Sequence, residues 1–165
     1  METSELMSTV PMTPRGLELL RAKLKLLREV ERPKNVRDIE EAMAHGDLRE
    51  NAEYHAAKDR QGHIDGQMKW AESQLASAEV IDPKTLSGDR VMFGATVTLI
   101  DSEEPDAPPI RYQIVGEAES DLANGRISYA SPIARAMMAK EEGDEVTIVS
   151  PNGRRKVIID EVEYV

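Results

Sequence analysis

The stretch YHAAKDRQGHIDGQMKWAESQLASA, residues 54–78, carries an unbroken heptad pattern. Its seam positions follow one another at alternating steps of three and four residues: Tyr54, Ala57, Gln61, Ile64, Met68, Ala71, Leu75 and Ala78. This spacing places all of them on one side of a helix and is typical of coiled coils. The stretch therefore predicts a long helix that needs a partner along its length.

A partner is predicted upstream in the same chain, where a second run of apolar residues has helical spacing: Leu17, Leu20, Leu24, Leu27, Val30, Val36, Ile39 and Met43. If the chain turns near residue 47, the two runs pair antiparallel with a drift of only about half a helical turn. Large residues then face small or flexible ones, as close packing requires. We predict an antiparallel coiled-coil hairpin with its turn at Gly46-Asp47-Leu48 and a length of roughly 45 Å.

One layer of this pairing breaks the apolar pattern, because Gln61 falls opposite Pro33. Proline lacks a backbone donor and clashes with the preceding helical turn. We therefore expect a kink at Pro33, with the Gln61 side chain bonding to carbonyls that the proline leaves free.

Composition limits the possible classes of protein. The chain has 165 residues, enough for one or two small domains, and aromatic residues make up only 4%. It has no cysteine, no apolar run long enough for a membrane span and no secretory pattern, so we expect a cytoplasmic location. The net charge of −10 argues against binding duplex DNA through general electrostatics.

The chain is predicted to form an α+β protein with two domains. Residues 1–11 are expected to be a disordered tail, 12–80 the hairpin, with Thr13 as N-cap and Pro14 in its first turn, 81–88 a linker and 89–165 a globular domain. In that domain the period changes to two, and we expect a twisted antiparallel sheet with one short helix, 132–140. The expected strands are 91–93, 95–100, 111–115, 125–129, 145–149 and 154–164.

The predicted turn carries two acids, Asp47 and Glu50, which have two interpretations. As N-cap and N3 residues of the second helix they would form a capping box. As outward ligands their β-carbons would lie about 5–6 Å apart, close enough to share one cation. Mg²⁺ takes six oxygen ligands, so two carboxylates could only complete a site held mostly by another macromolecule. His45 and His55 lie nearby and are expected to be helix-surface residues.

The first arm is basic: residues 15–37 contain eight Lys and Arg against three Glu. One interpretation is a solvated helix face with pairs four residues apart. The other is a basic stripe that follows a nucleic-acid backbone, with possible RNA contacts at Arg28, Arg32, Lys34, Arg37 and Arg49.

The tip run 45–57, HGDLRENAEYHAA, resembles that of the bacterial Gre transcript cleavage factors, and of their GreA branch more closely than their GreB branch. The resemblance extends from residue 11 to residue 165. Its other motifs are Pro11-Met12-Thr13, 91–97 (VMFGATV), 112–116 (YQIVG), 127–128 (IS), 131–135 (SPIAR) and 140–144 (KEEGD). Met43 and Ala44 depart from it, since close relatives carry charged residues just before the tip.

The resemblance implies a transcription elongation factor whose coiled coil enters the secondary channel of bacterial RNA polymerase. An FKBP-like C-terminal domain would bind the channel rim through Ser131 and Pro132. Asp47 and Glu50 would help to hold a Mg²⁺ ion shared with the polymerase, which then hydrolyses the 3′ end of backtracked nascent RNA. The chain itself would not be an enzyme and would hold no cofactor alone. It is expected to be a monomer that does not bind a membrane.

Three other functions deserve comparison. A channel inhibitor of the same shape would carry an altered tip, whereas the Asp47 and Glu50 pair favours activation. A prolyl isomerase would need an aromatic-lined pocket, and the C-terminal domain offers few aromatic residues: Phe93, Tyr112, Tyr129 and Tyr164. A chaperone arm would have an apolar tip, and this tip is charged.

Overall fold

The computed structural model describes residues 9–165. By its contacts the chain divides into two compact units, one formed by Glu18–Ser77 and the other by the residues up to Leu17 together with Ala78–Val165. The division falls a few residues before the expected linker at 81–88. The reason is that Ala78–Val80 pairs with a strand at the start of the chain.

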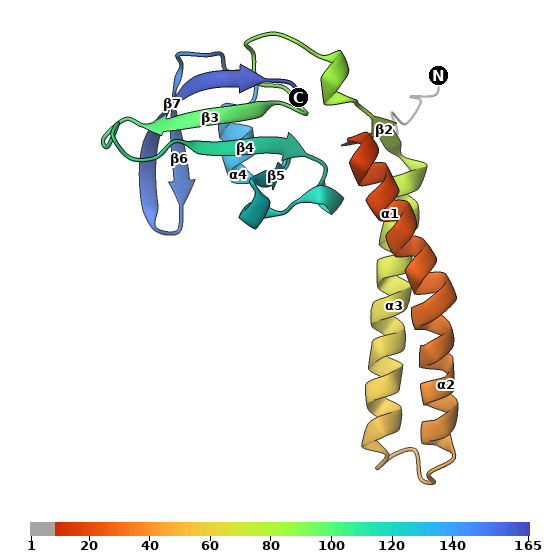
Figure 1. The fold of residues 1–165 in the computed structure, drawn as a ribbon. Helices are drawn as coiled ribbons and strands as arrows, with labels where there is room; N and C mark the ends of the chain where they lie inside the picture. Colours follow the sequence, from red (N-terminus) through yellow and green to blue (C-terminus); the bar gives the residue numbers. More distant parts are fainter. Residues whose placement is uncertain (1–8) are drawn as a thin grey trace, which may run out of the picture. The chain divides into compact units, whose positions relative to one another are not determined.

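The first unit is the predicted helical hairpin (Figure 1). Its first arm consists of α1 (Pro14–Leu26), a π-helical turn (Leu27–Glu31) and α2 (Arg32–Met43), and its second arm is α3 (Ala52–Ala76). The start of α1 is as predicted, because the amide of Gly16 donates to Thr13 Oγ1 at 3.2 Å. The heptad seam of α3 is also confirmed, with Ala57, Ile64, Met68 and Ala71 buried.

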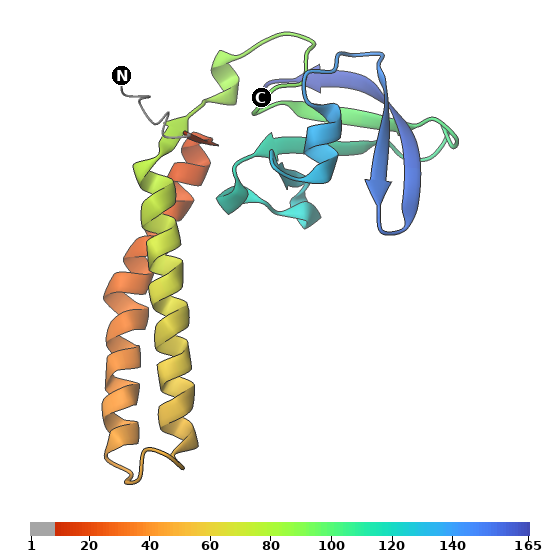
Figure 2. The ribbon, with the colours of Figure 1, turned by 180° about the vertical axis from the view of Figure 1, so that it is seen from behind.

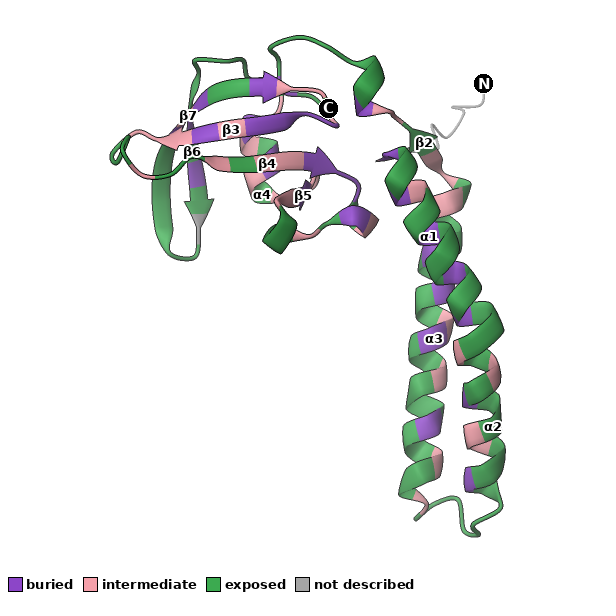
Figure 3. Ribbon diagram, in the orientation of Figure 1, coloured by how far each residue is buried: buried purple, intermediate pink, exposed green. Residues whose placement is uncertain are grey.

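The predicted seam of the first arm is correct up to Leu27 and, beyond it, wrong at three positions, while Ile39 is half-buried. Val30, Val36 and Met43 are 54%, 41% and 51% exposed. In their place Asn35 and Ala42 are buried, at 2% and 3% exposure, as the alternation of buried and exposed segments along α2 shows (Figure 3). Along α2 the inward face is therefore displaced by one residue from the predicted pattern.

The π-helical turn accounts for the observed face, because a regular heptad continued from Leu27 would reach residues 34 and 41, and one extra residue moves the seam to Asn35 and Ala42. The Arg32 amide donates to the carbonyl of Leu27, five residues back, so the turn holds one residue more than an α-helical turn. Pro33 follows at once in the first turn of α2 and has no amide hydrogen to donate. The irregularity expected at the proline thus begins before it and changes the phase of everything that follows.

The polar layer of the hairpin is formed by Asn35 and not by Gln61. Asn35 Nδ2 donates to the carbonyl of Ala57 on the other arm at 2.9 Å. Gln61 Oε1 instead accepts from Lys58 Nζ at 2.8 Å on the surface of α3, so the role predicted for Gln61 is wrong. A single buried amide in a coiled-coil seam fixes the register between helices.

The corrected register can be tested by two neighbouring alanine substitutions. Asn35→Ala should lower the free energy of unfolding of the hairpin by about 1–3 kcal/mol, because a buried contact and hydrogen bond are lost. Val36→Ala should change it by less than about 0.5 kcal/mol, since Val36 lies on the surface. Urea unfolding followed by circular dichroism measures both. Equal losses, or a larger loss for Val36→Ala, would restore the simple heptad pattern.

The second unit is built around a five-stranded sheet in the order β5-β4-β3-β7-β6. Its strands are β3 (Thr96–Asp101), β4 (Ile110–Val115), β5 (Arg126–Ser128), β6 (Glu145–Ser150) and β7 (Gly153–Glu163). Neighbouring strands are antiparallel, except that β5 runs parallel to β4 and so departs from the predicted antiparallel pattern. The expected strand at 91–93 is absent; next to it, Arg90 forms an isolated bridge to Glu141.

Helix α4 (Pro132–Met137) covers one face of this sheet, as the view from behind shows (Figure 2). Ala134 and Met137 are completely buried in a core that also contains Leu99, Ile114 and Ile159 from the strands. The helix ends earlier than predicted, and Ala139 just beyond it has a positive φ of 65°. This core holds the N-terminus of α4, and with it Ser131 and Pro132, at a fixed place on the sheet.

A two-stranded parallel sheet joins the start of the chain to the end of the hairpin. It is formed by β1 (Val10–Met12) and β2 (Ala78–Val80). The disordered tail predicted over 1–11 is therefore wrong for its last residues, and residues 1–8 lie outside the described part of the chain. Pairing at this point explains why Ala78, predicted as a seam position, belongs to a strand.

A buried carboxylate, Glu119, lies beside the first turn of α1. It is 4% exposed and accepts hydrogen bonds from the amide of Thr13 at 3.1 Å, from the Thr13 hydroxyl, and from the amide of Gly116 at 3.2 Å. Gly16 has no room for a side chain here, because a Cβ atom would lie 2.5 Å from the Glu119 carboxyl carbon. Glu119 therefore holds the first turn of α1, which belongs to the same unit as the five-stranded sheet.

We expect Glu119→Ala to lower the stability of this unit by about 1–3 kcal/mol, since two buried amides lose their acceptor. Glu117→Ala is the matched control, because Glu117 is exposed on the same short helical turn and should cost less than about 0.5 kcal/mol. Urea unfolding of the two variants decides the matter. Equal stability of the two would show that the buried bonds contribute nothing.

Candidate functional site

The loop between α2 and α3, residues 44–51, carries the two acids singled out in the sequence. Gly46 has a φ of +112°, which only glycine adopts without strain, and it lets the chain leave α2 sharply. Asp47 Oδ1 accepts from the amide of Arg49 at 3.0 Å, a local turn that aspartate favours. Both Asp47 and Glu50 are exposed on this loop.

The capping-box interpretation of these acids is wrong, because α3 begins later than they require. Its N-cap is Asn51, whose Oδ1 accepts from the amide of Tyr54 at 3.0 Å. Asp47 and Glu50 therefore precede the helix and do not cap it. Asn51 is not among the residues predicted from the sequence, although a side chain of this type before a helical pattern is a cap signal in its own right.

The two carboxylates are available to an external ligand. In the part of the chain that the structure describes, no group pairs with Glu50, and Asp47 uses one oxygen for the turn. Carboxylate oxygens suit Mg²⁺, but two residues supply too few of the six ligands that it takes. Across residues 9–165 no three His, Asp or Glu side chains gather where they could hold a metal ion. The donors fit a shared Mg²⁺ site and not a private one.

The two histidines near the tip differ in their contacts. His45 Nε2 lies 3.9 Å from a carboxylate oxygen of Glu53, on the exposed side of the hairpin. His55 Nε2 lies 3.2 Å from the carbonyl of Arg49 inside the loop, and its ring packs edge-on against Tyr54. His45 is a surface residue as expected, whereas His55 also contacts the loop.

The basic residues proposed as RNA contacts fall into two groups. Arg28 forms an ion pair with Glu72 of the other arm at 2.7 Å and so has a structural partner. The second group is exposed and has no side-chain partner among residues 9–165. It consists of Arg32, Lys34, Arg37 and Arg49. These four remain available to bind phosphates.

Ser131 and Pro132 form the N-terminus of α4, as predicted. Ser131 Oγ accepts from the amide of Ala134 at 3.3 Å, and Pro132 is the first helical residue and is exposed. The structure thus explains both residues as a cap and a helix start. A binding role for them stays a prediction.

Comparison with known proteins decides the family. Residues 10–80 match the family model described as transcription elongation factor, N-terminal, and residues 86–164 match the one described as transcription elongation factor, GreA/GreB, C-term. This chain belongs to the GreA/GreB family of transcription elongation factors. The resemblance found in its sequence is therefore confirmed.

Similar members of the family match this chain over nearly its whole length. Transcription elongation factor GreA of Anaeromyxobacter sp. (strain K) is 54% identical over 96% of this chain and 95% of its own. That of Phenylobacterium zucineum (strain HLK1) is 52% identical over 96% of this chain and 100% of its own. Among solved structures, GreA factor homolog 1 of Thermus thermophilus is 25% identical, covers 94% of this chain and 99% of its own, and has a TM-score of 0.43.

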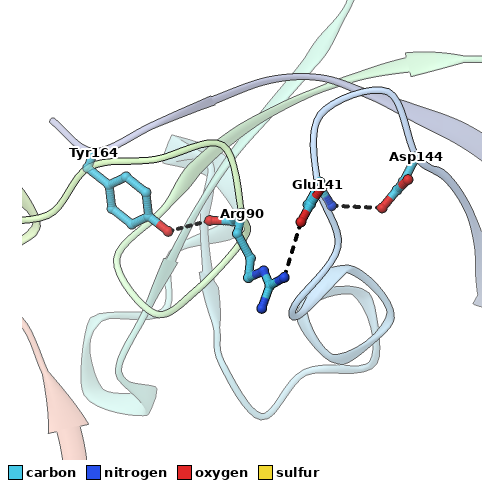
Figure 4. A network of polar contacts seen from close by, with 4 residues as sticks. All are labelled: Arg90, Glu141, Asp144 and Tyr164. Atoms are coloured by element: carbon cyan, nitrogen blue, oxygen red, sulfur yellow. Dashed lines mark hydrogen bonds and ion pairs between the residues drawn. The ribbon is translucent and has the colours of Figure 1, made fainter.

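A polar network supports the segment that follows α4 in this Gre-family domain (Figure 4). Arg90 pairs with Glu141 at 3.1 Å, and the Glu141 amide donates to Asp144 at 2.8 Å. The Tyr164 hydroxyl donates to the carbonyl of Arg90 at 2.5 Å and accepts from the amide of Met92 at 3.1 Å. Burial raises the pKa of Tyr164, and the hydrogen bond from the Met92 amide partly opposes this shift. The end of the chain thereby fixes the loop that leaves α4.

The C-terminal domain has a cleft lined in part by α4, but its lining does not suit a prolyl isomerase. Tyr112 is the single aromatic residue among those that line it. Charged side chains also reach it, including Asp101 and Arg155, which lie 3.4 Å apart.

No helix within residues 9–165 has the length and apolar character needed to cross a membrane.

The assignment of the cap predicts different effects for two neighbouring substitutions. Asn51→Ala should lower hairpin stability by about 0.5–2 kcal/mol, the usual loss on removing an N-cap. Asp47→Ala should change it by less than about 0.5 kcal/mol, because its turn is exposed. Thermal unfolding of the two variants measures the difference. The reverse order would mean that Asp47 is the cap after all.

Proposed function

We propose that this chain binds bacterial RNA polymerase and places its hairpin in the polymerase's secondary channel, where Asp47 and Glu50 complete the ligands of a Mg²⁺ ion. The polymerase then cleaves the 3′ end of backtracked nascent RNA, so that arrested transcription resumes. The chain stimulates this hydrolysis in trans and performs no reaction alone. The GreA/GreB family to which it belongs supports the proposal.

The observation that carries the proposal is the pair of exposed carboxylates, with three of their four oxygens unpaired in the described chain, on the loop of a helical hairpin. Neither Asp47 nor Glu50 caps a helix, and Glu50 has no partner in the described part of the chain. A ligand pair that cannot hold a cation alone suits a site whose other ligands belong to a second macromolecule. A hairpin of packed helices is a suitable carrier, because it can enter a channel without unfolding.

Each carboxylate has a distinct part in the proposed reaction. Mg²⁺ supplies charge stabilisation for phosphodiester hydrolysis when it is bound. Asp47 keeps one oxygen on the Arg49 amide and offers the other, so the turn holds its direction. Glu50 offers both oxygens and can accept a hydrogen bond from the attacking water. Two negative side chains also raise the local affinity for a cation that the polymerase alone holds weakly.

Other residues of the chain would bind the partners. The exposed arginines and lysine along α2 and on the tip loop, Arg32, Lys34, Arg37 and Arg49, suit the phosphates of the nascent RNA 3′ end. Ser131 and Pro132 would contact the rim of the secondary channel from the fixed start of α4. We expect the chain to act as a monomer in the bacterial cytoplasm, where the polymerase is found.

The proposal predicts that Asp47→Asn and Glu50→Gln abolish stimulated cleavage and leave binding to polymerase within about twofold. Each change removes one anionic ligand and keeps the size of the side chain. The assay follows release of the RNA 3′ segment from stalled, backtracked polymerase complexes, and a parallel titration measures binding.

Glu41→Gln is the matched control, because Glu41 is an exposed acid in the last turn of α2 and should be neutral in both measurements. Full cleavage with both tip variants would remove the metal-ligand role. Slower cleavage on addition of the unaltered protein would instead identify a channel inhibitor.

A further inference from the structure

The Asn51 side chain makes two bonds at the base of the tip loop, and only one of them belongs to helix capping. Its Oδ1 accepts from the amide of Tyr54, and its Nδ2 donates to the carbonyl of Ala42 on the opposite arm at 2.5 Å. We infer that Asn51, together with His55, is a positioning residue that holds the loop carrying Asp47 and Glu50 in one conformation. This inference rests on the function proposed above.

The choice of asparagine supports this role. An N-cap needs only an acceptor, and serine, threonine, aspartate and asparagine all provide one. Of these residues only asparagine also offers a side-chain amide that donates, and here the donor reaches a carbonyl nine residues back in the chain. The hydrogen bond from Asn51 to Ala42, which joins the two arms, is thus additional to the N-cap bond.

The acceptor of that bond is well fixed. Ala42 is buried in the seam near the end of α2, and its carbonyl also accepts from the amide of His45 at 3.1 Å. Carbonyls in the last turn of a helix lack partners within the helix, so this one is free to accept both bonds. Asn51 therefore ties the start of α3 to a part of α2 that packing already holds in place.

His55 provides a second contact that holds the loop, at Arg49 between the two acids. Its Nε2 contacts the carbonyl of Arg49, the residue just before Glu50, while the Arg49 amide donates to Asp47. Arg49 is thus held through both of its backbone polar groups. The T-shaped contact with Tyr54, at 5.6 Å between ring centroids, limits the motion of the imidazole.

These two contacts are important because Asp47 and Glu50 must bind a cation that they do not hold alone. A loop already ordered spends less conformational entropy when it docks. A displacement of a ligand by about 1 Å can cost about a hundredfold in rate. Loosening the loop should therefore weaken cleavage while leaving the rest of the hairpin able to bind.

The experiment uses two substitutions, each of which removes one of these polar contacts: Asn51 with Ala42, or His55 with Arg49. Asn51→Ser keeps an N-cap acceptor and loses the donor to Ala42. His55→Phe keeps the ring against Tyr54 and loses the contact with Arg49. The backbone order parameters of residues 46–50, measured by NMR on the free protein, should fall in both variants, while the remainder of α3 stays unchanged.

In the cleavage assay both variants should bind polymerase within about twofold of the unaltered protein and cleave about 10- to 100-fold more slowly at low Mg²⁺. The Mg²⁺ concentration for half-maximal cleavage should rise, and high Mg²⁺ should recover part of the rate. His55→Gln, whose amide can donate to the same carbonyl, should restore most of the activity.

Asp47→Asn in the same assay separates the two proposals. If it cleaves normally, the proposed function fails, and the positioning role fails with it. If it is inactive while Asn51→Ser and His55→Phe match the unaltered protein in rate and Mg²⁺ dependence, Asn51 is a cap alone and the inference is overturned. Lost polymerase binding, or unchanged order parameters, overturns it as well.

Discussion

The packing of α3 against the first arm is the constraint on which the hairpin depends. Neither arm has a core of its own, and most helical stability in proteins comes from the packing of an amphipathic face against a partner. Small residues such as Ala57 and Ala71 in the seam of α3 let the arms approach closely, and Leu20, Leu24 and Leu27 fill the opposite side. The tip loop has a defined shape because this seam brings the end of α2 and the start of α3 together.

The sequence predicted the helices better than it predicted their contacts. An unbroken heptad specifies a face without ambiguity, which is why the burial along α3 agrees with it. In the first arm the apolar residues on either side of Pro33 were taken as the seam, and Val30, Val36 and Met43 were consequently placed on the wrong face. The signal for the correct register was Asn35, a polar residue whose burial makes sense only opposite a backbone carbonyl.

The tip shows the same division between local and tertiary information. Asp47 and Glu50 were found from their spacing and from a specific motif, but the beginning of α3 was not. Both Asp47 and Asn51 are good N-cap residues, so local preference could not choose between them. The bond from Asn51 to Ala42 across the hairpin favours the later start. In the same way, no local pattern could have paired Glu119 with Thr13, which lies 106 residues earlier in the chain.

Most of the carboxylate oxygens on the tip loop take no part in its shape. Asn51, His55 and Gly46 set its shape, whereas Glu50 has no partner in the described chain and Asp47 commits one oxygen. Exposed carboxylates cost little while water and counterions screen them. Taken out of water without a cation, the same pair would repel and lose its hydration. A loop of this kind is stable in solution. When it enters a confined site, it binds best to a site that already holds positive charge.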